Sequence, residues 1–317
     1  MIVVTGGAGF IGSNIIKKLN QQGRSDIIVV DDLTNGHKIH NLTDLDIIDY
    51  VDKDTFYEKI DKTTIEITAI IHQGACSSTT EWDGKYIMNN NYRYSVKLLN
   101  YCQEKKIPFI YASSASVYGL GKNGFSVDRK CELPINAYAY SKFQFDQYVR
   151  QTLPFAQSPI IGLRYFNVYG PREQHKGNMC STIYHWYNQL KEDNTIKLFG
   201  YYDGYQGGEQ KRDFIHVDDV ADINLWFLEN NHSGIFNVGT GVAETFNDVA
   251  QQIFKWNDSK GYKTYVDFPE HLKGCYQSYT QADISGLREI GYTKPIMSIH
   301  EGIPKYLNYL KGIKNDN

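Results

Sequence analysis

The first twelve residues of the chain place a glycine-rich turn between an apolar strand and an amphipathic helix. The segment TGGAGFIG, residues 5–12, follows the β-branched run at 2–5 and opens a helix predicted over 11–21. In this setting Gly6 permits a tight turn, Gly9 lets a pyrophosphate approach the helix N-terminus, and Gly12 lets helix and strand pack closely. A chain that starts in this way is constrained to an α/β fold with a dinucleotide site.

The rest of the first half alternates short apolar runs with helical patterns. Strands are predicted at residues 2–5, 26–30, 67–72, 108–113 and 159–165, and helices near 11–21, 55–62, 86–105 and 138–152. This order predicts a Rossmann-like, doubly wound parallel sheet. Ligands bind such sheets at the carboxyl ends of the strands, where Gly6, Gln73 and Ser113 are expected.

The pattern loosens after Asn167, which indicates a second, smaller α/β domain for the substrate. Residues 1–167 and 212–240 are assigned to the nucleotide domain, and 168–211 and 241–317 to the substrate domain, with a short part of 275–290 returning to the larger one. Helices are predicted near 179–190 and 246–256, and a strand near 264–268. The chain is expected to return to the main sheet through a strand at 214–217, a helix at 218–229 and a strand at 235–238. Residues 200–208 are expected to form a surface loop or a flap over substrate.

Charge and cysteine content restrict the class of partner. The net charge of −3 provides no basic field for nucleic acid or for a membrane surface, so a small molecule is the expected partner. The five cysteines are scattered without metal-ligand spacing, which predicts reduced thiols, a cytoplasmic protein and no metal site. The apolar strand that begins at residue 2 leaves no room for a signal peptide.

One Tyr-x-x-x-Lys pair stands in a context that suggests redox chemistry. Four pairs have this spacing, but only Tyr138 and Lys142 follow both a nucleotide turn and a serine-rich strand end. Residues four apart share a helix face, whereas Tyr140 points away. A free phenol has a pKa of ~10, and the Lys142 ammonium together with the positive charge of an oxidised nicotinamide is expected to lower it so that Tyr138 acts as a base. Ser114 can hydrogen-bond the same substrate oxygen.

The acidic residues at the end of the second strand leave the cofactor open between NAD and NADP. Asp31, followed by Asp32, stands where a carboxylate accepts ribose hydroxyls, which favours NAD. Lys38 and Lys53 can supply positive charge for a 2′-phosphate.

Longer segments carry a resemblance to a known family. TGGAGFIG, YASSASVYG, AYAYSKF, RYFNVYGP and KRDFIHVDDVA resemble the extended short-chain dehydrogenases/reductases that act on nucleotide-linked sugars. More narrowly, HQGACSSTTEWDGKY, RYFNVYGPREQHKGNM and NLWFLENNHSGIFNVGTG resemble the ADP-L-glycero-D-manno-heptose 6-epimerases, over nearly the whole chain. The resemblance implies a homopentamer that uses NADP, with NAD as the alternative, and an ADP-heptose substrate for lipopolysaccharide core synthesis.

The resemblance also implies roles for individual residues. The implied catalytic residues are Ser114, Tyr138, Lys142 and a second base, Lys176. The implied cofactor contacts are Gly6, Gly9, Phe10, Ile11, Gly12, Asp31, Asp32, Lys38, Lys53, Gln73, Gly74, Ala75, Cys76, Ser77, Asn90, Lys142 and Val168. The implied substrate contacts are Ser114, Asn167, Asn178, His185, Phe199, Gly200, Arg212 and Tyr276.

Two bases suit an epimerase, because hydride leaves one face of a carbon and returns to the other. The carbonyl oxygen of the intermediate then lies near a different proton donor in each orientation, Tyr138 for one epimer and Lys176 for the other. Two alternatives stay open, a UDP-hexose 4-epimerase and a non-catalytic NADP(H)-sensing module of the same fold. A dehydratase is less expected, because Ala115 replaces the acidic residue that would expel water.

Overall fold

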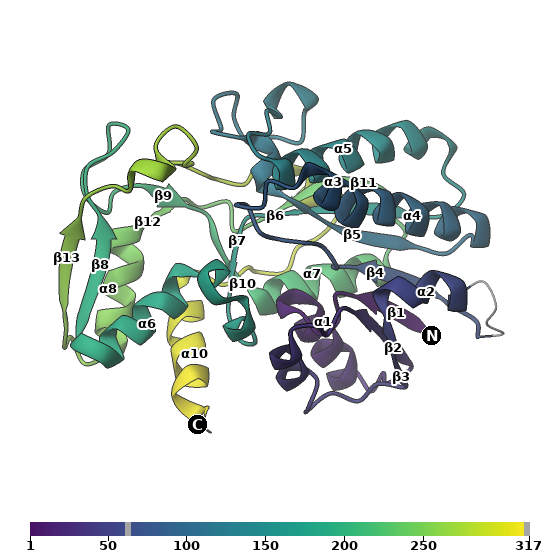
Figure 1. The fold of residues 1–317 in the computed structure, drawn as a ribbon, viewed down its shortest axis with the longest axis horizontal. Coiled ribbons are helices and arrows are strands. Elements are labelled where there is room, and N and C mark those ends of the chain that lie inside the picture. Colours follow the sequence, from purple (N-terminus) through teal and green to yellow (C-terminus); the bar gives the residue numbers. More distant parts are fainter. Residues whose placement is uncertain (61–64, 314–317) are drawn as a thin grey trace.

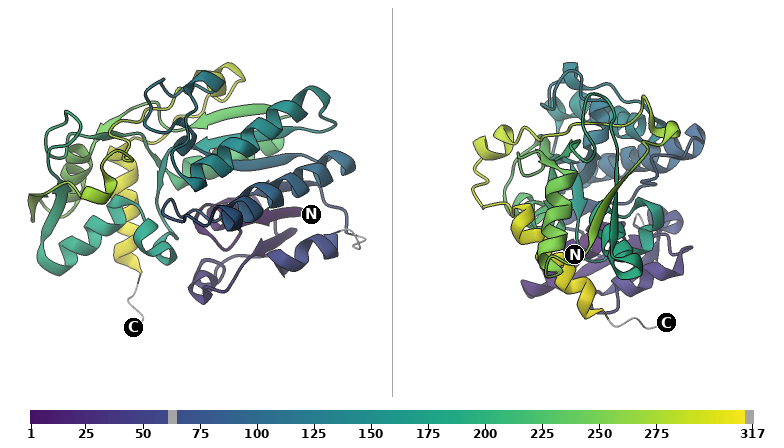
Figure 2. Two further views of the ribbon diagram at one scale, coloured as in Figure 1. Left: turned by 45° about the horizontal axis from the view of Figure 1, so that its top comes forward. Right: turned by 90° about the vertical axis from the view of Figure 1, so that its left-hand side faces the viewer.

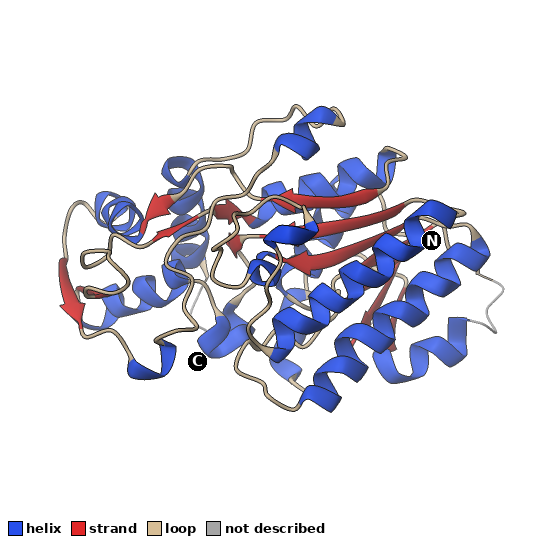
Figure 3. Cartoon of the chain, turned by 90° about the horizontal axis from the view of Figure 1, so that it is seen from above, coloured by secondary structure: helices blue, strands red, loops and turns tan. Residues whose placement is uncertain are grey.

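A seven-stranded parallel sheet forms the centre of the molecule. The computed structural model describes residues 1–60 and 65–313. The strands lie side by side, each parallel to its neighbours (Figures 1 and 3). Their order is β11 (Gly234–Val238), β6 (Ile160–Tyr165), β5 (Phe109–Ser114), β4 (Ala69–His72), β1 (Ile2–Thr5), β2 (Ile27–Asp31) and β3 (Asp49–Asp52). The predicted α/β, Rossmann-like fold class is confirmed.

Helices cover both faces of this sheet because successive strand residues point in opposite directions. Ile2 and Val4 of β1 pack in one apolar cluster with α1 (Phe10–Gln21) and α7 (Val217–Glu229). Val3 packs in a second cluster with α2 (Lys53–Ile60), α4 (Tyr94–Lys105) and α5 (Ala137–Thr152). The continuous apolar runs seen in the sequence reflect this burial on two sides.

Two details of the first half differ from expectation. The helix predicted over 86–105 is α3 (Gly84–Ile87), a π-helical turn (Met88–Arg93) and α4, because the buried Asn91 uses its side chain for contacts outside the helix. Strand β3 was not predicted, since only Val51 of its residues is buried. The helix predicted over 55–62 begins at Lys53, and its last two residues lie outside the described ones.

The elements of the predicted substrate domain gather at one end of the sheet. Helices α6 (Thr182–Asp193), α8 (Phe246–Trp256) and α10 (Ile299–Gly312) share an apolar cluster, in which α8 contacts both of the others (Figure 2). Beside them β8 (Thr195–Phe199) pairs in parallel with β13 (Tyr262–Val266). A short helix, α9 (Ser285–Glu289), returns to the cluster that contains α7.

The expected return to the main sheet at 214–217 is wrong. The strand there, β10 (Phe214–His216), pairs with β7 (Asn167–Tyr169) as a separate two-stranded sheet, because the chain turns away from the main sheet after β6. Strand β11 returns instead, beside β6. A further short pair joins β9 (Lys211–Arg212) to β12 (Glu244–Thr245). Across residues 1–60 and 65–313, every helix is too short or too polar to span a bilayer.

Candidate active site

The glycine turn after β1 has a shape that only glycine permits. Gly6 has φ +66°, and a Cβ on it would lie 2.6 Å from the backbone nitrogen of Gly74. A Cβ on Gly12 would overlap the carbonyl oxygen of Gly6. Helix α1 starts at Gly9 with no side-chain cap and no acidic residue in its first turn, so its first N–H groups can bind an anion. The turn therefore fits a dinucleotide pyrophosphate.

A cavity of about 350 Å³ adjoins this turn at the ends of β1, β2 and β4. The expected cofactor residues that line it are Gly6, Asp31, Asp32, Lys38, Lys53, Gly74, Ala75, Cys76 and Asn90. It is also lined by Thr34, Asn35, Tyr86 and Tyr94, which were missed because no motif spacing marks them. The other expected contacts, Gly9, Phe10, Ile11, Gly12, Gln73, Ser77, Lys142 and Val168, lie outside its lining.

The two carboxylates at the end of β2 form ion pairs with lysines from later elements inside this cavity. Asp31 is buried, accepts a hydrogen bond from the backbone N–H of Ala8 at 2.8 Å and forms an ion pair with Lys38. Asp32 lies 3.4 Å from the Lys53 ammonium, which donates to Asn90 at 3.0 Å. Hydrogen bonds from Thr34, aided by Lys53, lower the pKa of Asp32 to about 2. Both carboxylates thus have cationic partners.

The structure brings Ser114 and Tyr138 together. Ser114 ends β5, and Tyr138 lies in the first turn of α5, whose N-cap Asn136 accepts from Ala139 N–H at 2.8 Å. The two hydroxyls hydrogen-bond, which lowers the pKa of Tyr138, but burial is the larger effect and raises it. Tyr140 is 47% exposed, so it points away as predicted.

Lys142 lies on the same helix but turns to the backbone of β5. Its ammonium is buried and donates to the carbonyl oxygen of Ala112 at 2.8 Å. Burial lowers the pKa of Lys142 to about 8, against the opposing charge of Asp146. Lys142 therefore does not depress the pKa of Tyr138 as expected, because burial of the phenol prevails and raises it. The expected effect of the nicotinamide charge stays a prediction.

Asn91 connects the cofactor cavity to α5 and was missed in the sequence. Its side chain accepts from the N–H of Cys76 at 2.8 Å and donates to the carbonyl of Cys76 at 2.9 Å. It also donates to the hydroxyl of Ser141 at 3.1 Å. The signal was the run of three asparagines in a predicted helix interior, where asparagine is unfavourable.

Lys176 lies beside the start of α1. It belongs to a 3-10 segment (Gln174–Met179), and its ammonium lies 5.1 Å from the centre of the Phe10 ring at the start of α1. Within residues 1–60 and 65–313 the ammonium forms no hydrogen bond or ion pair, while the backbone N–H of Lys176 donates to the carbonyl oxygen of Glu173 at 2.9 Å. Since Phe10 follows β1 and Ser114 ends β5, both sites lie at the carboxyl edge of the sheet.

Three of the expected substrate residues meet in an aromatic cluster. Arg212 is buried, with its guanidinium carbon 4.6 Å from the ring centre of Tyr276 and 5.6 Å from that of Phe246. Phe199 lies 6.1 Å from Tyr276 between ring centres. No carboxylate pairs with Arg212 in the described parts of the chain, and burial lowers its pKa. Such a buried cation is stabilised by an anionic ligand.

The remaining expected substrate residues stand outside this cluster. Asn167, at the start of β7, is exposed, and so is Asn178. His185 contacts the neighbouring Tyr184 on α6, and Gly200 donates its N–H to Val266 at 2.7 Å. Residues 200–208 fold back on themselves through a Tyr202 and Tyr205 bridge, and Tyr202 stacks on Phe268 at 3.8 Å.

Comparison with known proteins is consistent with this geometry. Residues 2–239 match the NAD dependent epimerase/dehydratase family. The chain belongs to this family.

Solved structures of epimerases superpose on this family member over almost its full length. An ADP-L-glycero-D-manno-heptose-6-epimerase from Helicobacter pylori is 29% identical, with a TM-score of 0.83, covering 98% of this chain and 96% of that one. A UDP-glucose 4-epimerase from Thermotoga maritima is 27% identical, with a TM-score of 0.84 and 98% of both chains covered. A Bacillus cereus UDP-glucuronic acid 4-epimerase, in complex with UDP-glucuronic acid and NAD, is 25% identical, with a TM-score of 0.79 and 98% of both chains covered.

This epimerase/dehydratase therefore acts on nucleotide sugars with a nicotinamide dinucleotide. Its residues fit the cofactor, because the uncapped start of α1 provides N–H groups and Asp31 ends β2 beside the cavity.

Proposed function

We propose that this protein interconverts ADP-D-glycero-D-manno-heptose and ADP-L-glycero-D-manno-heptose at C6. The observation that carries the proposal is the position of Lys176, a second basic side chain at the sheet edge that also holds Ser114 and Tyr138. Its ammonium forms no hydrogen bond or ion pair with the described residues and lies beside the Phe10 ring, so it can serve a second orientation of the sugar. The similarity to the Helicobacter pylori enzyme supports the same substrate.

Each side chain has a role that follows from its surroundings. A bound NAD(P) supplies reversible acceptance of hydride and, when oxidised, a positive charge that lowers the pKa of a neighbouring phenol. Tyr138, whose pKa is raised by burial, holds its proton for donation to a carbonyl oxygen, and Ser114 orients that oxygen. Lys176 exchanges the proton when the oxygen points the other way.

The aromatic cluster around Arg212 provides the nucleotide end of the proposed site. Its buried guanidinium can form two parallel hydrogen bonds to a diphosphate, which a lysine cannot. Phe199 and Tyr276 add ring surface beside it. Asn167, Asn178, His185 and Gly200 are proposed as further contacts to the sugar nucleotide.

We propose NADP as the bound cofactor, with NAD as the alternative. Lys38 and Lys53 enter the cavity and can satisfy a 2′-phosphate, while Asp31 and Asp32 can accept ribose hydroxyls. The mass of the nucleotide released by denaturing the purified protein decides between them. Release of NAD alone would overturn the NADP proposal and leave the epimerase proposal intact.

The reaction is tested by incubating the protein with each ADP-heptose epimer and separating the products by chromatography. Conversion in both directions without added cofactor is expected, because the cofactor ends each cycle unchanged. Parallel incubation with UDP-glucose tests the second candidate, a UDP-hexose 4-epimerase, which the TM-score of 0.84 to the Thermotoga maritima enzyme favours. Turnover of UDP-glucose alone would replace the first proposal, and turnover of neither would favour the cofactor-sensing module.

A homopentamer and a part in lipopolysaccharide synthesis are further proposals that rest on the family resemblance. The division into nucleotide and substrate domains and a cytoplasmic location are proposals that rest on the sequence pattern and on the scattered cysteines. Light scattering of the purified protein tests the pentamer, and a monomer or dimer would overturn it.

A further inference from the structure

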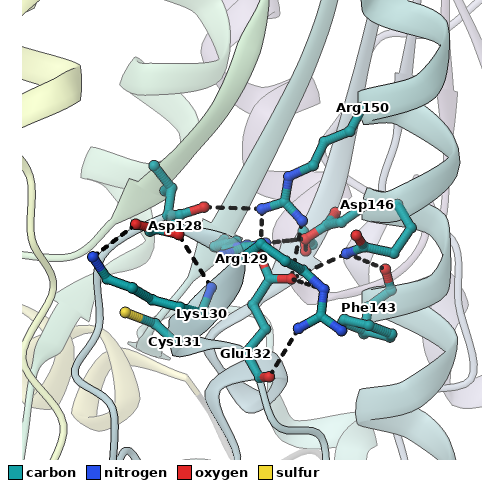
Figure 4. Close-up of polar contacts among 12 residues, drawn as sticks. Asp128, Arg129, Lys130, Cys131, Glu132, Phe143, Asp146 and Arg150 are labelled. Carbon is teal, nitrogen blue, oxygen red and sulfur yellow. Dashed lines mark hydrogen bonds and ion pairs between the residues drawn. The ribbon is translucent and has the colours of Figure 1, made fainter.

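A cluster of charged side chains that includes Glu132, Asp146 and Arg150 joins α5 to the loop before it (Figure 4). Arg164 of β6, Asp146 of α5 and Glu132 of the preceding loop have fully buried side chains. Arg164 pairs with Asp146 at 2.8 Å and with Glu132, and Glu132 also binds Arg150. Buried charges are rare unless each has a partner, and here each is paired.

Asp146 is the member of this cluster that connects α5 to β5. Its carboxylate accepts from the Tyr111 hydroxyl at 2.9 Å and from the Ser113 hydroxyl at 2.9 Å. A third hydrogen bond comes from Arg164 at 2.9 Å. Ser113 immediately precedes Ser114, so the carboxylate holds the end of the strand that carries the proposed catalytic serine.

Asp146 also follows Lys142 by one turn of α5 and lies on the same face. The groups that face the Lys142 ammonium are the Ala112 carbonyl from β5, Asp146 from its own helix and His72 from β4. His72 is neutral, because burial lowers its pKa to about 3. Asp146 therefore supplies the one negative charge that acts on Lys142 among these groups.

We propose that Asp146 is a positioning residue of the active site, which fixes the end of β5 against α5 and keeps Lys142 in its charged form. It touches neither substrate nor cofactor and acts through Ser113 and Lys142. Its effect on turnover rests on the proposed function, whereas its effect on Lys142 does not.

Glu132 offers a matched control within the same cluster. It is as deeply buried as Asp146 and shares Arg164, but its other hydrogen bonds come from Arg150 at 2.9 Å and Gln147 at 3.0 Å. Glu132 lies on the loop before α5, whereas Asp146 follows Lys142 by one helical turn. Glu132→Gln thus removes a buried carboxylate that also pairs with Arg164, and it leaves the Asp146 carboxylate beside Lys142 in place.

The first test compares kcat–pH profiles of Asp146→Asn and Glu132→Gln. In Asp146→Asn the pH at which kcat falls on the alkaline side should be lower by about one unit or more. The reason is that loss of the opposite charge lowers the pKa of the Lys142 ammonium. Glu132→Gln should leave the pH of this alkaline fall unchanged, even if it lowers kcat at every pH. If kcat falls at the same alkaline pH in both variants, the proposal is overturned.

The second test needs no substrate and follows thermal stability between pH 6 and pH 9. The pKa of Lys142 is below its ordinary value, so the unfolded chain binds more protons above about pH 8 and the stability contribution rises with pH there. In Asp146→Asn this rise should begin at lower pH, so its loss of Tm relative to the wild type should be smaller at pH 8 than at pH 6. Glu132→Gln should show a constant loss, and equal behaviour of the two variants would contradict the role in charging Lys142.

If Asp146→Asn does not fold, Ser113→Ala tests whether Asp146 positions the end of β5. This variant keeps the Asp146 carboxylate and removes the hydrogen bond that Ser113 donates to it. Ser113→Ala should lower kcat at least threefold, while KM and the pH of the alkaline fall in kcat stay unchanged. A kcat equal to that of the wild type would show that the tie does not position Ser114. If the wild type has no activity on any nucleotide sugar, the proposed function fails, and the stability test still decides the effect on Lys142.

Discussion

Replacing Arg212 by methionine should weaken nucleotide binding without weakening the fold. The guanidinium is buried beside the rings of Tyr276 and Phe246, and it donates a hydrogen bond to the carbonyl oxygen of Lys211 at 2.9 Å. Burial without a carboxylate partner disfavours the cation, which is why its pKa is lowered. Methionine fills a similar apolar volume and removes this cost.

The expected loss of affinity follows from the hydrogen bonds that a diphosphate would accept. A hydrogen bond to a charged group contributes about 1.5–3 kcal/mol, so the Kd for ADP should rise roughly 10- to 150-fold. The melting temperature of the ligand-free variant should equal or exceed that of the wild type, because an uncompensated buried charge has been removed.

Titration calorimetry with ADP and thermal melts with and without ADP measure both effects. At 100 times the wild-type Kd, ADP should stabilise the wild type by about 2.7 kcal/mol and a 100-fold weaker variant by only about 0.4 kcal/mol. Lys211→Met is the matched control, since this neighbour on β9 has no side-chain hydrogen bond or ion pair with the described residues. An unchanged Kd in Arg212→Met, or a large fall of its ligand-free Tm, would refute the reasoning.

Three further predictions concern the cofactor turn, Lys142 and Lys176. Gly12→Ala should destabilise the protein by about 3 kcal/mol, because the added Cβ overlaps the Gly6 carbonyl oxygen, and should lower the amount of bound nucleotide. A Tm and a cofactor content equal to those of the wild type would contradict the close packing. Turnover should fall above about pH 8 as Lys142 loses its proton, and a kcat that stays flat to pH 10 would show that its charge is not needed. Lys176→Met should abolish epimerisation while the protein still releases one equivalent of nucleotide per chain on denaturation. Activity near that of the wild type would show that Lys176 is not the second base.

The parallel sheet could be predicted from sequence because its strands are buried on both faces and therefore stand out as apolar runs. Strand β3 carries no such signal, since Asp49 is exposed and Asp52 is half-buried. The pairing of β7 with β10 joins residues 167 and 214, and nothing local specifies a contact over that separation. The sequence therefore predicted a strand at 214–217 but not that it pairs with β7 outside the main sheet.

The site was predictable where it follows motif spacing and not where it depends on packing. Ser114 and Tyr138 meet as the helix and strand motifs require. The Lys142 side chain turns toward the Ala112 carbonyl because of the way α5 packs against β5. The Tyr-x-x-x-Lys spacing does not determine that packing. In the sequence Asp146 is an ordinary helix carboxylate, and its proposed role follows from its burial and its ion pair with Arg164, which no motif marks.

The most direct test of the account is proton NMR of the purified protein with ADP-D-glycero-D-manno-heptose in D₂O and no added cofactor. Signals of the L-glycero epimer should appear with hydrogen retained at C6, because the hydride leaves and returns within one site while only hydroxyl protons exchange with solvent. Absence of the second epimer, or deuterium at C6, would contradict epimerisation by transient oxidation.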